Sequence, residues 1–366
     1  MFELKDLHIR LTSECNMNCL HCYAANWFKK HLELTYDDIK HIILQAEALG
    51  CKNVTFTGGE PLISSHIYNS IKFCLSRNLN VSLETNGVLI ENIIPVLNAL
   101  DLKKLKFSVS YDGVVMRRPN FTDVVKRNII RLVDLGCNLE IQTTVTQLNI
   151  GEIDYILDFS KCLGIKNRVF LSHSPNGNGK SLNLLGVVDW LKIIKHIKSK
   201  YDNANVELPD VFSEKTSRKC GWGVHRCEIM PNGDVTSCGP ITFNKVGFIA
   251  GNVKEQHLEK IWNSEHFIYI RNLKQSDFKG LCAKCNYWKH CLGACRSVSY
   301  SNGNNLLDPH PFCVLIYNFV KNGEIDETLF LNYRRVQEWV KQIENSDFLP
   351  ETELYGTIVK NQHTFV

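Results

Sequence analysis

The chain has 366 residues, of which 44% are hydrophobic, so it is long enough for two compact domains with their own cores. It has no apolar run near the roughly 18 residues that a membrane helix needs, and Met1 to Lys5 lack the apolar region of a signal peptide, so we expect a cytoplasmic protein. The formal net charge of +4 comes without any basic run interleaved with aromatic residues, which argues against nucleic-acid binding.

The first half of the chain, from about residue 5 to residue 205, alternates short β-rich runs with amphipathic helices, which predicts repeated βα units around a parallel sheet. One helix should begin after Thr35, which has Asp38 three residues later as in a capping box, and should end at Gly50. Further helices are predicted over Phe121 to Leu135 and over Val188 to Lys200. The six predicted strands are Leu7 to Leu11, Val54 to Phe56, Val81 to Leu83, Leu105 to Val109, Leu139 to Val145 and Arg168 to Leu171.

The pattern changes in the second half, where residues 206 to 320 hold short segments, a hairpin turn at Pro231 to Asp234 and many cysteines. Such a loop-rich segment buries little apolar surface, so we expect bound metal to supply much of its folding free energy. A helix around Glu327 to Ile343 follows. We therefore predict a first domain at residues 1–205, a second at residues 206–345 and a tail at residues 346–366.

Fifteen cysteines are present, and in a secreted protein they would indicate disulfides. Eleven of them instead have the spacing of metal ligands, which fits a reducing compartment. We interpret the other four as small buried hydrophobic residues; these are Cys51, Cys74, Cys137 and Cys162.

Three cysteines, Cys15, Cys19 and Cys22, follow the first predicted strand with the spacing CxxxCxxC, and His21 precedes the third. A structural zinc site usually takes four protein ligands, and so does a fully thiolate-ligated 4Fe–4S cluster. Three thiolates from one loop would leave one iron open to an external ligand. A redox loop or a zinc loop is the alternative.

Eight more cysteines lie in the second half, enough for two sites with four ligands each. They are Cys220, Cys227, Cys238, Cys282, Cys285, Cys291, Cys295 and Cys313, with Gly233 five residues before the third of them. Two structural zinc sites are the alternative that spacing alone leaves open.

Together these motifs resemble the radical S-adenosylmethionine (SAM) enzymes that carry a SPASM extension. The resemblance implies an α/β fold in which a partial (βα)6 TIM barrel, with its site at the C-terminal ends of the strands, precedes a Cys-rich SPASM domain with two auxiliary 4Fe–4S clusters. It implies that Cys15, Cys19 and Cys22 hold a third, catalytic 4Fe–4S cluster that binds SAM. It assigns Cys220, Cys227, Cys238 and Cys295 to the nearer auxiliary cluster, and Cys282, Cys285, Cys291 and Cys313 to the farther one.

Other segments resemble those that line the SAM site in this family. Thr57-Gly58-Gly59-Glu60-Pro61 follows the second strand, where glycines would permit close approach and the carboxylate would balance the SAM ammonium, although such a tetrapeptide alone is an ordinary turn. Ser110 is a candidate for the ribose hydroxyls, and Asn86 is a weaker one because Asn-Gly is also a common turn. The cofactor-binding candidates are His21, Gly58, Gly59, Glu60, Asn86 and Ser110.

The polar loop from His173 to Lys180 follows the sixth strand. It either shapes the substrate entrance at the barrel mouth or is a plain connection. We interpret His173 as a hydrogen-bonded structural residue rather than a catalytic base.

The reaction class implied by the resemblance is cleavage of SAM to a 5'-deoxyadenosyl radical, which abstracts hydrogen from a substrate. Two auxiliary clusters indicate a further use for electrons, so we expect a radical SAM oxidoreductase that forms a crosslink or an unsaturation in a ribosomally made peptide. Gly239 follows Cys238 where sulfatase-activating relatives carry Asp, which counts against that activity. The alternatives are a small-molecule dehydrogenase or a tetrapyrrole-modifying SPASM enzyme and, more distantly, a non-catalytic metal-stabilised binding protein.

The expected partners are a peptide or small-molecule substrate and an electron donor such as flavodoxin or ferredoxin, with no nucleic acid and no membrane. Since only fourteen residues precede Cys15, we expect any recognition of a leader peptide to need a separate protein or another surface.

Overall fold

The computed structural model describes residues 2–117, 119–171, 176–212, 221, 223–242, 248–303 and 305–346. His173, Cys220 and residues 347–366 of the predicted tail lie outside the described residues. Throughout the described ranges, every helix is too short or too polar to span a bilayer.

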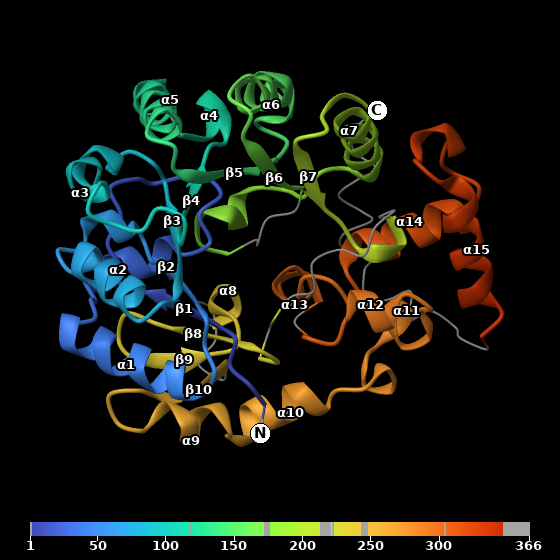
Figure 1. Ribbon diagram of the computed structural model, residues 1–366. Coiled ribbons are helices and arrows are strands. Elements are labelled where there is room, and N and C mark those ends of the chain that lie inside the picture. The colour runs from blue at the N-terminus through green and yellow to red at the C-terminus, as the bar shows by residue number, and fades with distance from the viewer. Residues whose placement is uncertain are drawn as a thin grey trace.

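A ten-stranded sheet organises the described part of the chain, in the order β10-β9-β8-β1-β2-β3-β4-β5-β6-β7 (Figure 1). All pairings from β8 through β1 to β7 are parallel, and β9 and β10 are antiparallel to their neighbours. Because β10 and β7 end this order, the sheet is an open, partial barrel. The strands are β1 (Asp6–Arg10), β2 (Asn53–Thr57), β3 (Asn80–Thr85), β4 (Leu105–Ser110), β5 (Asn138–Thr144), β6 (Lys166–Phe170), β7 (Ala204–Glu207), β8 (Arg226–Ile229), β9 (Asp234–Thr236) and β10 (Ile249–Asn252).

Helices connect the strands and cover the outside of the barrel (Figure 1). The first half contains α1 (Tyr36–Ala48), α2 (Ile67–Ser76), α3 (Ile94–Leu97), α4 (Gly113–Arg117), α5 (Pro119–Asp134), α6 (Ile153–Cys162) and α7 (Val187–Lys200). The second half contains α8 (Gly239–Thr242), α9 (Leu258–Trp262), α10 (Glu265–Asn272), α11 (Gly280–Lys284), α12 (Trp288–Cys291), α13 (Arg296–Gly303), α14 (Pro311–Lys321) and α15 (Tyr333–Glu344). Short 3-10 helices are η1 (Ala25–Lys30), η2 (Pro61–Ile63), η3 (Ile90–Asn92), η4 (Ile150–Glu152), η5 (Gly177–Ser181), η6 (Asp210–Phe212), η8 (Gln275–Asp277) and η9 (Glu327–Leu329).

The local sequence signals of the first half are confirmed. All six predicted strands form, with ends shifted by no more than two residues. At the start of α1, the Thr35 hydroxyl accepts the Asp38 backbone N–H at 3.2 Å, and the Asp38 carboxylate accepts the Thr35 N–H at 3.0 Å. This is the predicted capping box, and it satisfies two backbone donors that the helix itself cannot.

Two elements differ from the prediction. The strand β7 adds a seventh parallel strand beside β6, so the predicted domain boundary at residue 205 falls inside it. The helix predicted over Glu327 to Ile343 is divided into η9 and α15, because the Asn332 side chain caps a new helix by accepting the Arg335 N–H at 3.0 Å.

The second half of the chain continues the barrel sheet. Strand β8 lies parallel to β1, with Leu7 opposite Cys227 and Ile9 opposite Ile229. The predicted hairpin turn at Pro231 to Asp234 connects β8 to β9, and the Met230 N–H donates to the Asp234 carbonyl at 2.8 Å. Strand β8 therefore joins the cysteine-rich second half directly to β1, the first strand of the barrel sheet.

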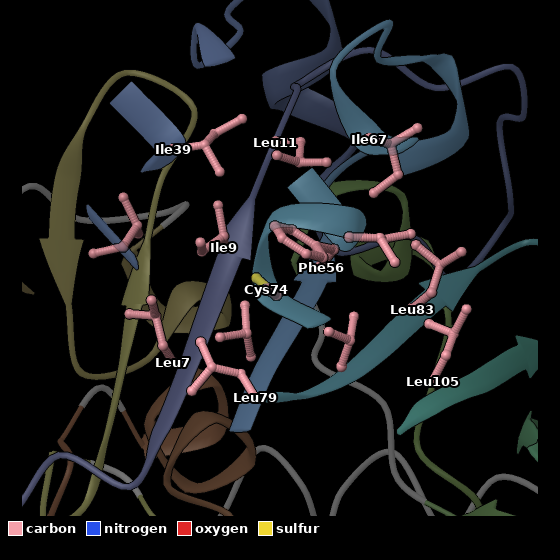
Figure 2. Close-up of a cluster of buried hydrophobic side chains, with 14 of the residues drawn as sticks. Leu7, Ile9, Leu11, Ile39, Phe56, Ile67, Cys74, Leu79, Leu83 and Leu105 are labelled. Carbon is pink, nitrogen blue, oxygen red and sulfur yellow. The ribbon is translucent and has the colours of Figure 1, made fainter. Parts of the chain in front are cut away.

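The main core lies between the strands and the helices that cover them (Figure 2). Leu7, Ile9 and Phe56 are fully buried, and Ile39 of α1 and Cys74 of α2 pack on the same core. Burying each such side chain stabilises the fold by about 1.5–3 kcal/mol.

Three of the four cysteines outside the metal-like spacings are buried or half-buried, as interpreted: Cys51, Cys74 and Cys137. Cys162 is exposed, so the interpretation is wrong for this residue. It is the last residue of α6, whose buried positions recur at Ile153, Ile156, Leu157 and Ser160, and Cys162 lies on another face.

One buried ion pair crosses the sheet between β1 and β8, where the Arg10 guanidinium donates to the Glu228 carboxylate. The two side chains are only 6% and 7% exposed. Burial alone would lower the pKa of Arg10, but Glu228 and Tyr23 raise it above its ordinary value. Burial would raise the pKa of Glu228, but Arg10 holds it below its ordinary value. Both groups therefore stay charged and depend on each other.

We predict that Glu228→Ala lowers the free energy of unfolding by about 3–5 kcal/mol, because it leaves the Arg10 charge buried without its partner. The double variant Arg10→Met/Glu228→Met should be clearly more stable than the single one, since it leaves no unpaired charge. Denaturant titration of anaerobically prepared protein measures both. Glu47→Ala is the control, because its pair with Arg77 is partly exposed and should contribute roughly 0.2–1 kcal/mol. A Glu228→Ala effect as small as that of the control would contradict the prediction.

Candidate active site

The CxxxCxxC loop begins where β1 ends, at the C-terminal edge of the parallel strands. Cys15, Cys19 and Cys22 are all half-buried, and Cys19 and Cys22 are electrostatic neighbours of Cys15. Burial, together with the nearby Glu60, Cys19 and Cys22, raises the pKa of Cys15 to about 12. The Cys15 thiol therefore remains protonated unless a cation stabilises its thiolate, and three neighbouring thiols on one loop fit an iron–sulfur cluster.

The Gly58-Gly59-Glu60 segment packs against the base of this loop. The Gly59 N–H donates to the Thr12 carbonyl, and the Glu60 N–H donates to the Glu14 carbonyl, both at 2.8 Å. A Cβ atom at Gly59 would lie 2.1 Å from the Glu14 carbonyl oxygen, so only glycine fits there. The sequence predicted that the glycines permit approach to a cofactor; in the structure they permit approach to the cysteine loop.

Glu60 is fully buried and connects the ends of β2 and β3. Its carboxylate accepts hydrogen bonds from the Thr85 hydroxyl at 2.7 Å, from the Asn86 backbone N–H at 2.8 Å and from the Leu62 N–H at 3.1 Å. The carboxylate predicted to balance the SAM ammonium is thus an acceptor of hydrogen bonds within the protein, and it fixes where Asn86 lies.

Asn86 contacts the cysteine loop directly. Its side-chain amide donates to the Asn16 side chain at 2.8 Å and lies 3.8 Å from the Cys15 sulfur. Ser110 is the last residue of β4, at the same edge of the sheet as Asn86.

His21 lies beside a buried acid that the sequence analysis did not select. Its Nε2 is 3.6 Å from Asp112 Oδ2, and Asp112 is only 1% exposed. The Asp112 carboxylate also accepts the Thr144 N–H at 2.7 Å. The sequence did contain a signal for Asp112, because this aspartate lies two residues after Ser110, at the end of a predicted strand.

The loop after β6 packs on the cysteine loop as well. The Asn178 side chain donates to the Asn18 side chain at 2.6 Å and to the Cys19 carbonyl at 2.9 Å. Asn176 donates to the Ser301 hydroxyl at 3.1 Å, on α13 of the second half. Of the two interpretations offered for this loop, contact with the candidate site favours the first.

The four cysteines assigned to the farther auxiliary site come together: Cys282, Cys285, Cys291 and Cys313. They line one pocket of about 380 Å³, and the other three are electrostatic neighbours of Cys313. Burial raises the pKa of Cys282 to about 12 and that of Cys313 well above its ordinary value. Four buried thiols around one pocket fit a cluster bound by four thiolates.

The cysteines assigned to the nearer auxiliary site do not all lie in the same part of the structure. Cys238 is buried with Ile241 and Tyr300, and Cys295 directly precedes α13, which packs against α8. Cys227 lies instead in the main core, fully buried beside Cys51. Successive strand residues point to opposite faces, so Cys227 points away from the side to which Glu228 turns. The structure therefore does not bring Cys227 into the group of side chains around Cys238.

Within the described ranges, no three His, Cys, Asp or Glu side chains converge as ligands of a single metal ion. The thiolates of a zinc site surround one ion, whereas each thiolate of a 4Fe–4S cluster binds its own iron.

Two family models match this chain. Residues 9–159 match the Radical SAM superfamily, and residues 220–286 match the SPASM iron-sulfur cluster-binding domain. The chain therefore carries a radical SAM domain followed by a SPASM domain.

Similar proteins have several named activities. An AdoMet-dependent heme synthase of Methanosarcina barkeri is 28% identical over 83% of this chain and 94% of its own length. The mycofactocin maturase MftC of Mycolicibacterium smegmatis is 26% identical over 83% of this chain and 81% of its own length. Neither identity fixes the activity of this chain.

Solved structures share the fold. SuiB of Streptococcus suis bound to S-adenosylmethionine has a TM-score of 0.65 and 20% identity, covering 85% of this chain and 77% of its own. The anSMEcpe protein with bound AdoMet and the Cp18Cys peptide has a TM-score of 0.65 and 17% identity, covering 92% and 99%. The fold prediction of a partial barrel followed by a SPASM domain is confirmed.

We predict that Cys227→Ala and Cys238→Ala differ in iron content. Cys227→Ala removes a core thiol, so it should keep its iron and lose on the order of 1 kcal/mol of stability. Cys238→Ala should lose about four irons per chain. Iron and sulfide analysis after anaerobic reconstitution separates them, with Cys74→Ala as the matched core control. Loss of four irons from Cys227→Ala would instead return Cys227 to the ligand set.

Proposed function

We propose that this protein binds three 4Fe–4S clusters and SAM, and that it oxidatively modifies a ribosomally made peptide. The main support for this proposal is that segments from three different strand ends meet at one loop. The segments that follow β2, β3 and β6 all hydrogen-bond to the CxxxCxxC loop that follows β1. Each comes from the C-terminal end of a parallel strand, where barrels of this kind hold their reacting groups.

Cys15, Cys19 and Cys22 would hold the catalytic cluster, and SAM bound there supplies a 5'-deoxyadenosyl radical. The chain's own residues orient this site. Backbone hydrogen bonds from Gly59 and Glu60 fix the start of the loop, and Asn178 fixes its middle. Such fixed geometry places a reactive group against one substrate hydrogen rather than against water.

The proposed SAM site is lined by Gly58, Asn86, Ser110 and Asp112, since they lie around the loop at the strand ends. Glu60 acts behind them, because its carboxylate holds Thr85 and Asn86 rather than facing solvent. Its role is positioning, because it holds Asn86, whose side chain contacts the cysteine loop.

Oxidation of the substrate follows from electron balance. If the substrate loses one hydrogen atom and then one proton, one electron remains and requires an acceptor. The cysteines of the second half would hold the proposed acceptor for this electron, and a donor such as flavodoxin or ferredoxin would supply the electron that SAM cleavage requires. A peptide substrate is supported by relatives that include a mycofactocin maturase and a structure of SuiB with its precursor peptide SuiA.

Sulfatase activation is disfavoured on steric grounds. The Gly239 N–H donates to Glu228 at 2.7 Å, and a Cβ atom at residue 239 would lie 2.4 Å from the same carboxylate. An aspartate, as the sulfatase-activating relatives carry, would displace the partner of Arg10. Modification of a tetrapyrrole is the second candidate, favoured by the 28% identity to a heme synthase.

We predict that SAM affinity falls about tenfold or more in Glu60→Ala, because the variant frees the Asn86 backbone from a buried hydrogen bond to a charged group, a contribution of roughly 1.5–3 kcal/mol, and so lets this side of the proposed SAM site move. Thr85→Val removes only one of these bonds and should weaken binding less. Equilibrium dialysis of SAM with anaerobically reconstituted protein measures both, and Glu47→Ala controls for loss of a carboxylate elsewhere. Unchanged affinity in Glu60→Ala would separate this residue from the SAM site.

The function itself is tested by anaerobic incubation with SAM, a reductant and small peptides encoded beside this gene, followed by mass spectrometry. We expect 5'-deoxyadenosine together with a peptide that has lost two hydrogens. The triple variant Cys15→Ala/Cys19→Ala/Cys22→Ala should make neither product while its auxiliary clusters remain visible by EPR.

A peptide that exchanges one hydrogen with solvent at constant composition would indicate epimerisation instead. Turnover of a porphyrin precursor but of no peptide would establish the second candidate.

A further inference from the structure

Helix α15 closes the pocket of the farther auxiliary site, although it lies beyond residues 220–286 of the SPASM match. The Trp339 indole N–H donates to the Cys285 sulfur at 3.3 Å. One turn later, the Gln342 side chain donates to the Lys284 carbonyl at 2.6 Å and accepts the Asn286 N–H at 3.2 Å. The helix is therefore fixed on both sides of Cys285.

Packing determines the direction of the Trp339 N–H. The side chain is 2% exposed and meets Phe212 and Tyr317 edge to face, each at a ring separation of 6.1 Å. A phenylalanine would fill this core nearly as well, but a buried tryptophan also presents a donor that needs a partner. In this protein that partner is a cysteine sulfur of the candidate cluster site.

The backbone that follows Cys285 turns back on this residue, because the Trp288 N–H donates to the Cys285 carbonyl at 3.0 Å. A second indole lines the same pocket: the Nε1 atom of Trp288 is buried and has no hydrogen-bond partner within the described residues. A buried donor without a protein partner is costly, and sulfur acceptors within the pocket would satisfy it.

We propose that Trp339, with Trp288 as a second donor, raises the reduction potential of the cluster held by Cys282, Cys285, Cys291 and Cys313. Hydrogen bonds to cluster sulfurs stabilise the added negative charge of the one-electron-reduced state more than the oxidised state. The inference rests on the proposed function for the presence of this cluster. It assigns Trp339 a positioning role: the farther cluster becomes the favoured site for the electron withdrawn from the substrate.

The test is Trp339→Phe in the full chain with all clusters reconstituted, examined by EPR-monitored redox titration with dithionite. One of the three midpoint potentials should become more negative, while the other two and the iron content stay unchanged. Trp288→Phe should shift the same potential in the same direction. The matched control is Trp190→Phe, because Trp190 is 1% exposed in the same core and contacts Phe212 and Phe312. It should shift none of the three.

Unchanged potentials in Trp339→Phe with full iron content would overturn the inference, as would an equal shift in Trp190→Phe. If Trp339→Phe fails to retain the cluster, wild-type protein labelled with 15N at the indole provides the test. Pulsed EPR of the reduced farther cluster should show a coupled indole nitrogen, and its absence would overturn the inference. Failure of the proposed function is distinguishable, because wild-type iron far below about twelve per chain would remove the cluster itself.

Discussion

The buried ion pair between Arg10 and Glu228 is the interaction on which the relative placement of the two halves depends. Arg10 also donates to the Tyr23 hydroxyl at 2.8 Å and to the Gly58 carbonyl at 3.3 Å, and Glu228 accepts the Gly239 N–H at 2.7 Å. Tyr23 directly follows Cys22, and Gly239 directly follows Cys238. One pair of side chains thus connects the catalytic loop, the glycine segment and the nearer auxiliary loop. Because a charge left alone in such a place is strongly destabilising, these three segments cannot move independently.

The loop after β6 makes a second connection between the same regions. Asn178 holds the Cys19 carbonyl, and Asn176 reaches Ser301 on α13, the helix that begins just after Cys295. The two connections start from different strands of the sheet. The ion pair joins β1 to β8, and the Asn176 hydrogen bond joins the loop after β6 to α13. Together the two connections join the catalytic loop to the segments that carry Cys238 and Cys295. The SPASM half is therefore built into the barrel rather than attached to it.

The sequence predicted those features that depend on residues close together in the chain. Thr35 and Asp38 form their capping box, and CxxxCxxC follows its strand, because both depend on neighbours in the chain. Long-range pairing was not readable: the spacing of Cys227 resembles that of a ligand, but its strand pairs with β1 and turns it into the core. The same limit applies to α15. Its apolar positions predicted a helix, yet nothing in its periodicity shows that Trp339 would meet a sulfur more than fifty residues earlier.

The burial of the thiols links assembly of the cofactors to folding. Burial raises the pKa of Cys282 to about 12 and keeps Cys313 protonated, so the pocket favours neutral thiols until a cation replaces their protons. Cluster binding must then release those protons and supply the free energy that the short helices α11 and α12 cannot supply by packing. Helices α14 and α15 differ, because they belong to a core that includes Trp190, Phe212 and Phe312. This core forms one wall of the pocket and places the Trp339 donor at the Cys285 sulfur, so packing of the protein sets part of the electrostatics of the farther site.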